Sequence, residues 1–401
     1  RTYDDPLGRP INLDDLRALI VGIKGQGAIA QAYAPVCAAD ADIADANPQW
    51  RLFRNDGQPQ SLGDLLQVMN PGAAGWQNYW IEQYSRALDV LGFDGLHLDT
   101  YGYPRAALDD HGDAVEMDDG YASFIAAVRR ARPHEVISFN QVNGVPRDLI
   151  PPSDPSFRYV EIWPPNTLWR HLEALLQRSA GAAPFHGDTI AIYPPVWHLE
   201  GDAALYTVLT SHAVLTMLGA NALVWGDRRG VLCHPYYVNH HNLNAADAER
   251  VLEWHRFGLR CRDLFKAGVD TSWYELSDEN AAVVVNGGGQ VSPEPVGGAL
   301  FTRVRRDHHR VAVSVLDLRG SADGSWSSGT EPGEGDELEV IVVVERPERW
   351  HAQVAVLGKE GGRFVPVPTE SREMREGNGL VCRVPLVTGW SVVRFVEGEE
   401  S

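Results

Sequence analysis

Up to about residue 268, apolar positions along the chain recur in two alternating patterns. Apolar residues that return every three or four positions predict helices at 13–25, 76–91, 121–131, 167–179, 203–218 and 245–267. Short apolar runs between them predict strands at 28–36, 51–54, 94–99, 135–142, 157–163, 189–196 and 221–227, of which 51–54 is the weakest. Strands that alternate with helices at this interval predict a parallel sheet covered by helices.

The number of these strands favours a (β/α)8 TIM-type barrel over residues 1–268. Seven strands are one short of a closed barrel, so we expect the first strand to lie upstream of Arg1 or to be disguised near Thr2 and Tyr3. A doubly wound open sheet would accept seven strands, but it needs a glycine-rich phosphate loop after its first strand, and the sequence has none.

From residue 269 the pattern changes to alternation with a period of two. It predicts strands at 281–285, 300–305, 311–316, 337–344, 351–357, 381–385 and 391–396, with no helix among them. Turns rich in glycine, serine and aspartate separate these strands. The sequence therefore predicts a second domain, 269–401, that is an all-β antiparallel sandwich.

Charge narrows the class of partner. The chain of 401 residues carries a formal net charge of −19 and has three lysines, so we expect neither nucleic acid nor an anionic membrane surface as a partner. No apolar run is long enough to span a membrane. Four widely spaced cysteines form no zinc or disulfide pattern. An uncharged substrate would not be repelled by this net negative charge. The sequence does not indicate an oligomeric state.

Polar and aromatic residues gather where the predicted barrel strands end. The groups in chain order are His97/Asp99/Tyr101, Asn140/Asn143, Glu161/Trp163, Tyr193/Trp197 and Trp225/Asp227. The carboxyl ends of barrel strands meet at one mouth, so Asp99 and Glu161 are expected to face each other across a pocket walled by aromatic rings.

Two carboxylates between aromatic platforms suit the cleavage of a glycosidic bond. One acid must be ionised at the anomeric carbon and the other must hold a proton for the leaving oxygen. Taken one at a time, these residues are also compatible with structural roles. Asp99 could cap a turn, Glu161 could form a salt bridge and Trp163 could belong to a core.

Several segments also resemble glycoside hydrolase family 66, the dextranases and cycloisomaltooligosaccharide glucanotransferases. Residues 93–102 (FDGLHLDTYG) resemble its nucleophile segment, and 159–163 (YVEIW) resemble its acid/base segment. Phe139 and Asn140 are similar to the end of the strand between them. Residues 226–239 resemble its late motif, and the order of motifs holds from about residue 5 to 264.

The resemblance implies a retaining endo-hydrolase of α-1,6-linked glucan, with Asp99 as nucleophile and Glu161 as general acid/base. It implies substrate contacts from Asp94, His97, Asn140, Trp163 and Asp227. Other residues from the strand ends and the late motif complete the expected substrate-binding set: Tyr101, Tyr193, Trp197, Tyr236 and Asn239.

Departures from the family pattern leave two alternatives. Leu96 stands where the family usually has tryptophan, and Pro164 and Pro165 follow the acid/base segment, so the reaction class is better supported than dextran as substrate. A glucanotransferase that forms cyclic isomaltooligosaccharides is one alternative, although the short loops leave no room for the family's carbohydrate-binding insertion. A catalytically silent glycan-binding protein on an incomplete barrel is the other.

No cofactor and no metal is expected. The spacing of His234, His240 and His241 matches no zinc signature, and the aspartates of 109–119 lack the pattern of an EF-hand loop. The expected partner is an α-glucan or isomaltooligosaccharide. The resemblance favours secretion, while the sequence itself does not identify the compartment.

Overall fold

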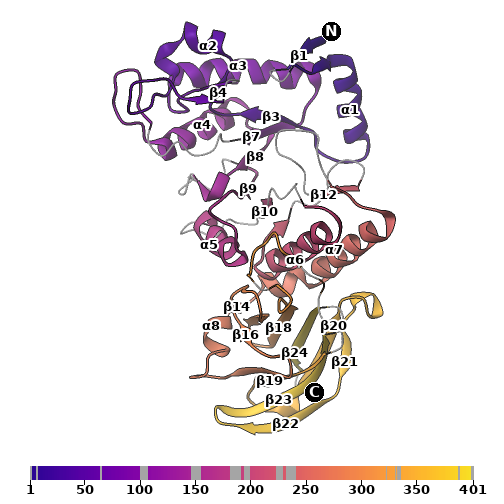
Figure 1. Ribbon diagram of the computed structural model, residues 1–401. Helices are drawn as coiled ribbons and strands as arrows, with labels where there is room; N and C mark the ends of the chain where they lie inside the picture. The colour runs from indigo at the N-terminus through magenta and orange to yellow at the C-terminus, as the bar shows by residue number, and fades with distance from the viewer. Residues whose placement is uncertain are drawn as a thin grey trace. The chain divides into compact units, whose positions relative to one another are not determined.

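The computed structural model forms two compact units (Figure 1). It describes residues 2–5, 8–63, 66–99, 107–145, 155–180, 191–193, 199–222, 229–231, 241–321, 323–329, 331, 336–386 and 389–398. Unit 1 comprises Arg1–Ile162 and Leu175–Ala191, and unit 2 comprises Trp163–Ala174 and Ile192–Ser401.

Unit 1 is built on parallel strands that alternate with helices. Its larger elements are α1 (Leu13–Gly25), β3 (Gln31–Pro35), α3 (Ala74–Leu91), β7 (Gly95–Asp99), α4 (Met117–Ala131), β8 (Val136–Asn140) and β9 (Phe157–Glu161). The predicted helices and four of the predicted strands are confirmed within a few residues. Asn12 caps α1, as its side chain accepts the backbone N–H of Asp14 at 2.9 Å.

The four strands pair in parallel in the order β3-β7-β8-β9. The register places Tyr33 opposite His97, His97 opposite Ser138, and Asn140 opposite Tyr159. Gly95 allows β7 and β8 to approach, because a Cβ there would lie 1.9 Å from the carbonyl oxygen of Val136. Side chains alternate along a strand, so these residues all share one face.

The other face of the strands forms the core with α3 and α4, which Figure 1 shows beside β3 and β7. Leu96, Leu98 and Phe139 are fully buried there with Trp80 and Phe124 of the helices. Burial of side chains of this size contributes about 1.5–3 kcal/mol each. The helices therefore cover one face and leave the other to polar residues.

The strand prediction at 51–54 is wrong, and one of the two positions expected for the first barrel strand, near Thr2 and Tyr3, is excluded. Residues 2–4 form β1 (Thr2–Asp4), which pairs antiparallel with β2 (Pro10–Asn12) in a separate sheet and is no barrel strand. Residues 51–54 make only isolated bridges, such as Arg51 with Met69. They lie beside a small sheet of β4 (Ala38–Ala39), β6 (Leu66–Val68) and β5 (Ser61–Leu62), with α2 (Ala41–Ala46) nearby. Residues 51–54 have the apolar pattern of a strand, but their bridges go to three separate residues, Met69, Pro59 and Leu108, and form no ladder.

Closure of the barrel is not seen among the described strands. β10 (Ala191–Tyr193) and β11 (Asn221–Ala222) continue the strand order after β9, which gives a sheet of six strands in the described ranges. Helix α5 (Trp169–Ala180) precedes β10 as predicted. The coarse prediction, a mixed α/β fold with a parallel sheet, is confirmed.

In unit 2, two long helices pack on a β-rich part. Helices α6 (Gly201–Met217) and α7 (Ala245–Lys266) lie side by side (Figure 1). α6 is buried on all sides from Ala204 to Met217, as expected for a helix enclosed by protein. A short hairpin of β12 (Gly230–Val231) and β13 (His241–Asn242) precedes α7. Trp390 contacts three α7 side chains, including Phe257 with ring centroids 4.8 Å apart.

Two sheets follow α7, and all seven predicted strands are present. One sheet has the order β14-β17-β18-β24-β20-β21 with β16 paired to β17, and the other has the order β15-β19-β23-β22. The first contains β14 (Val269–Asp270), β16 (Val291–Ser292), β17 (Leu300–Arg306), β18 (Arg310–Asp317), β20 (Trp350–Val356), β21 (Val365–Val367) and β24 (Trp390–Glu397). The second contains β15 (Val283–Asn286), β19 (Asp336–Val343), β22 (Thr369–Met374) and β23 (Gly377–Leu386).

Side chains from both sheets share one apolar core, which includes Val304, Val313, Val340, Val354 and Phe395. The pairs are antiparallel apart from β16 with β17. One expectation is wrong, since helix α8 (Ser272–Glu275) lies among these strands. The predicted domain boundary at 268–269 falls between α7 and β14, but the compact units divide the chain elsewhere, so it stays a prediction.

Candidate active site

A cluster of polar side chains occupies the carboxyl ends of the parallel strands in unit 1. It contains Asp99 of β7, Asn140 of β8 and Glu161 of β9, each the last residue of its strand, and the side chain of Tyr33 from the middle of β3. Each lies on the face opposite the helices, as the register requires. Parallel strands bring their carboxyl ends to one edge, which is why residues far apart in sequence meet here.

Asn140 connects the two carboxylates. Its amide nitrogen Nδ2 donates to Asp99 Oδ1 and to Glu161 Oε2, each at 2.8 Å. Its oxygen Oδ1 accepts the backbone N–H of Glu161 at 3.2 Å. An amide has two N–H donors on one nitrogen, so both bonds can form at once. The two carboxylate oxygens therefore lie no farther apart than twice 2.8 Å.

The cluster is asymmetric in its exposure. Asn140 is fully buried and Glu161 is 8% exposed, whereas Asp99 is only half-buried. The hydroxyl of Tyr33, a side chain that is 56% exposed, donates to Asp99 Oδ2 at 2.5 Å. Both oxygens of Asp99 thus accept a hydrogen bond, which fixes the orientation of this carboxylate.

His97 lies one step back from the strand end on the same face. Its Nε2 is 2.7 Å from the hydroxyl of Tyr159, and its ring meets that of Tyr33 edge-on with centroids 5.5 Å apart. Burial lowers the pKa of His97 to about 4. A neutral imidazole at this place can exchange hydrogen bonds with hydroxyl groups without adding charge.

Asp94 is placed away from this cluster. It precedes β7, at the amino end of the strand, and its carboxylate pairs with Lys24 Nζ at 2.7 Å. It also accepts the backbone N–H of Ala30 at 3.0 Å. The hydrogen bond from Lys24 and the one from Ala30 hold the pKa of Asp94 below its ordinary value. The structure does not bring Asp94 together with Asp99 and Glu161.

The other predicted substrate residues are described in part or not at all. Trp163 follows β9 and belongs to unit 2, where its carbonyl accepts the backbone N–H of Asn166 at 3.2 Å. Tyr193 ends β10. Five of the predicted residues lie outside the described residues: Tyr101, Trp197, Asp227, Tyr236 and Asn239.

Two residues of the cluster were not predicted from the sequence, Tyr33 and Tyr159. Both alternate with apolar residues in their strands, since Tyr33 lies between Ala32 and Ala34 and Tyr159 lies two positions before Glu161. Counting back by two from Glu161 would have placed Tyr159 on the polar face, whereas the predicted strand 28–36 ends on Val36 and gives no such signal for Tyr33.

The described residues also bear on two further features, a metal site and a membrane-spanning helix. In the part of the chain that the structure describes, no three His, Cys, Asp or Glu side chains are grouped so as to hold a metal. No described helix is long and apolar enough to cross a membrane.

The geometry suits chemistry that needs two acids at one reacting atom. For glycosidic cleavage, carboxyl groups about 5–5.5 Å apart accompany retention of configuration, and about 6.5–9.5 Å accompanies inversion. The Asn140 bridge keeps Asp99 Oδ1 and Glu161 Oε2 within twice 2.8 Å of each other, which is closer than the inverting range.

A family model and the curated relatives point to the same family. The family model described as glycosyl hydrolase family 66 matches residues 1–394. A cycloisomaltooligosaccharide glucanotransferase of Niallia circulans is 26% identical over 181 residues, 40% of this chain and 19% of that protein. A dextranase of Streptococcus salivarius is 30% identical over 169 residues, 37% of this chain and 20% of that protein. The chain thus aligns with about a fifth of the length of these curated relatives.

The fold has a close solved counterpart. The structure of a Paenibacillus cycloisomaltooligosaccharide glucanotransferase in complex with cycloisomaltoheptaose superposes with a TM-score of 0.80 at 15% identity. The match covers 98% of this chain and 77% of that one. With a family model that matches nearly the whole length, and a resemblance carried by the segments around Asp99, Asn140 and Glu161, the chain belongs to glycosyl hydrolase family 66.

Proposed function

We propose that this chain is a retaining glycoside hydrolase of α-glucan that cleaves internal α-1,6-glucosidic linkages. The observation that carries the proposal is the Asn140 amide nitrogen, which lies 2.8 Å from an oxygen of Asp99 and 2.8 Å from an oxygen of Glu161. Carboxylate oxygens this close leave too little room for a water molecule between the base carboxylate and the anomeric carbon, which an inverting enzyme needs.

Each acid has a role in the proposed double displacement. Asp99 attacks the anomeric carbon while Glu161 donates a proton to the leaving glycosidic oxygen, which gives a covalent glucosyl ester. Glu161 then removes a proton from water, which attacks the same carbon and releases Asp99. Asn140 and Tyr33 hold Asp99 in a fixed orientation, which lowers the entropic part of the barrier.

The substrate class is supported by charge and by the relatives. A chain with net charge −19 suits a neutral glucan, and the relatives are named a dextranase and cycloisomaltooligosaccharide glucanotransferases. His97 and Trp163 are proposed to contact glucosyl units. The proposal extends to the predicted residues Tyr101, Tyr193, Trp197, Asp227, Tyr236 and Asn239.

The architecture we propose is a (β/α)8 barrel followed by a β-sandwich. Three features support the barrel: parallel pairing of β3, β7, β8 and β9, alternation of strands with helices, and acidic residues at the carboxyl ends of strands. The two sheets with their shared core support the sandwich.

A second candidate is a glucanotransferase that forms cyclic isomaltooligosaccharides. It uses the same first step, after which a glucan hydroxyl replaces water, and two relatives carry this name. The reaction products distinguish the hydrolase from the glucanotransferase. Incubation with dextran, other α-glucans and β-glucans, followed by reducing-end assay and mass spectrometry, should show new reducing ends from dextran alone. Cyclic products without reducing ends would favour the transferase, and binding without turnover would indicate a silent glycan-binding protein.

Removal of either acid is the direct genetic test. Asp99→Asn and Glu161→Gln should each lower kcat on dextran by about a thousandfold or more, because each removes a group that reacts in the transition state. Both variants should keep the melting temperature of the wild type within a few degrees. Wild-type turnover in either variant would remove that residue from the mechanism.

A further inference from the structure

The segment that follows Glu161 is held by a loop of the β-rich part of unit 2. Residues 163–174 belong to unit 2, and they include a turn in which the backbone N–H of Asn166 donates to the carbonyl of Trp163 at 3.2 Å. Leu168 forms a β-bridge with Ser325, and the backbone N–H of Trp169 donates to the Gly324 carbonyl at 3.0 Å.

Trp326 makes the central contacts. Its indole Nε1 donates to the carbonyl of Asn166 at 2.6 Å, and its backbone N–H donates to the carbonyl of Thr167 at 3.2 Å. The side chain is 5% exposed. Trp326 therefore binds the carbonyl groups of two successive residues, Asn166 and Thr167, in the turn that begins at Trp163.

The 323–329 loop has hydrogen bonds of its own and packs against α6. Asp323 Oδ1 accepts the backbone N–H of Ser325 at 3.0 Å and the hydroxyl of Ser328 at 2.6 Å, and these two bonds lower the pKa of Asp323. Gly329 packs against α6 so closely that a Cβ would lie 2.3 Å from the Thr207 nitrogen. The loop is thus fixed from within and against a buried helix.

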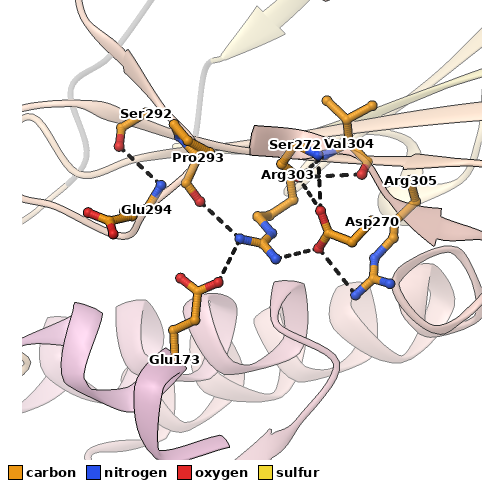
Figure 2. A network of polar contacts seen from close by, with 9 residues as sticks. All are labelled: Glu173, Asp270, Ser272, Ser292, Pro293, Glu294, Arg303, Val304 and Arg305. Atoms are coloured by element: carbon orange, nitrogen blue, oxygen red, sulfur yellow. Dashed lines mark hydrogen bonds and ion pairs between the residues drawn. The ribbon is translucent and has the colours of Figure 1, made fainter. Parts of the chain in front are cut away.

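A buried ion network secures the other end of the segment. Figure 2 shows Arg303 between Glu173 of α5 and Asp270 of β14. Arg303 Nη1 lies 2.9 Å from Glu173 Oε1 and donates to the Pro293 carbonyl at 3.0 Å. Arg303 and Glu173 are both buried, and the loss of Arg303 would leave the Glu173 carboxylate without its cation. The turn is therefore anchored before α5 by Trp326 and within α5 by Arg303.

We propose that Trp326 is a positioning residue for substrate binding, which acts by holding the 163–168 turn so that the Trp163 ring meets a glucosyl unit. The inference rests on the proposed function, because it takes Trp163 as a substrate contact. It gives the β-rich part of unit 2 a role in glucan affinity in addition to support of the fold.

Trp326→Phe is the test variant, since it removes the indole donor but keeps a large ring in the buried site. We expect the KM for linear isomaltoheptaose to rise about two- to tenfold, the effect of one lost hydrogen bond, while kcat changes less than twofold. Trp350→Phe is the matched control. Its indole donates to the Glu345 carbonyl at 3.2 Å in the same β-rich part, so it should leave KM unchanged.

A double-mutant cycle with Trp163→Ala shows whether Trp326 acts through Trp163. Trp163→Ala alone should raise KM, and Trp326→Phe should add no further increase in that background. A purely structural role would lower the melting temperature of Trp326→Phe without separating KM from kcat. That result would overturn the inference. So would a double variant whose increase in KM equals the product of the increases caused by Trp326→Phe and Trp163→Ala alone.

Binding without turnover distinguishes this inference from the proposed function. In the Glu161→Gln background, Trp326→Phe should weaken isomaltoheptaose binding, measured by calorimetry, by the same two- to tenfold. If the wild type cleaves dextran and Trp326→Phe behaves like Trp350→Phe, only the inference fails. If the wild type neither cleaves dextran nor binds isomaltoheptaose, the proposed function fails and the inference fails with it.

Discussion

The two ends of β7 carry the same kind of residue in opposite settings. Asp94 precedes the strand and pairs with Lys24 at 2.7 Å, whereas Asp99 ends the strand and shares Asn140 with Glu161. Five positions of extended chain separate them by about 16 Å. One carboxylate meets a cation on α1, and the other meets a second carboxylate.

The difference shows how strand direction assigns roles. Opposite charges at the amino end satisfy each other, which contributes to stability and leaves nothing to react. Like charges at the carboxyl end are held together by a neutral amide, an arrangement that costs free energy and is useful only if a proton or a substrate enters it. We therefore expect changes at the carboxyl end to affect turnover and changes at the amino end to affect stability.

Asn140→Asp should have the largest effect among the supporting residues. It keeps the shape of the side chain but replaces a double donor with a third carboxylate beside Asp99 and Glu161. We expect kcat on dextran to fall about a hundredfold, the typical cost of one preorganised donor. Ser138→Ala, two positions earlier on the same face, removes a hydroxyl that donates to Gln31 and should change kcat less than threefold. If Asn140→Asp and Ser138→Ala changed kcat equally, Asn140 would have no special role in turnover.

Tyr33→Phe should lower kcat about tenfold, because it removes one charge-assisted hydrogen bond to Asp99. The control is Tyr84→Phe, the same change on α3, where the ring stacks on Trp80 with centroids 4.0 Å apart. Steady-state rates on dextran measure both. If Tyr33→Phe keeps wild-type kcat, the Asp99 carboxylate does not depend on this hydroxyl for its orientation.

His97 lies between the two ends and should affect the dependence of stability on pH. Burial lowers its pKa from 6.5 to about 4. Between these values the unfolded chain binds a proton that the folded chain does not, so stability falls as the pH falls, by up to about 1.4 kcal/mol per pH unit. His97→Gln, which does not titrate, should reduce this slope in denaturant titrations at pH 4.5–6.5. His111→Gln, at a side chain that is 78% exposed, serves as the control, and an unchanged slope in His97→Gln would contradict the assignment.

Asp94→Asn should have the smallest effect and should act on stability alone. The pKa of Asp94 is lowered by Lys24 and Ala30, so its contribution is present above its unfolded value of 3.8 and is lost as the pH falls through the lowered value. For a pair this exposed we expect a loss of at most about 1 kcal/mol at pH 7. Lys24→Met should cost a similar amount, with little further loss in the double variant. A tenfold fall in the kcat of Asp94→Asn would instead show that Asp94 takes part in substrate binding or catalysis.

The sequence predicted the elements of the sheet and the central pair. Alternation of helical and strand patterns located β3, β7, β8 and β9, and the strand ends pointed to Asp99, Asn140 and Glu161. The placement of Asp94 was missed because its motif neighbours lie at the carboxyl end, while strand direction puts residue 94 at the amino end. Tyr33 was missed because the apolar run 28–36 suggests burial, and only pairing with β7 turns this ring toward Asp99.

Contacts between distant segments were beyond sequence patterns. The tryptophans of the C-terminal region form no stripe in sequence, yet Trp326 and Trp390 are buried while Trp273 is 57% exposed. Loop 323–329 has the composition of an ordinary turn, and its contact with residues 166–169 depends on tertiary folding. Thr2 and Tyr3 have strand propensity, but pairing with β2 gives them a hairpin.

The central claim is that Asp99 becomes covalently glucosylated while Glu161 exchanges the proton. A fluorinated α-isomaltosyl fluoride, which forms a glycosyl enzyme quickly and releases it slowly, should trap this ester. Peptide mass spectrometry should then find the sugar on the peptide that contains Asp99, and proton NMR of early dextran products should show the α-anomer. An adduct on another residue, or the absence of an adduct together with β-anomeric products, would contradict the account.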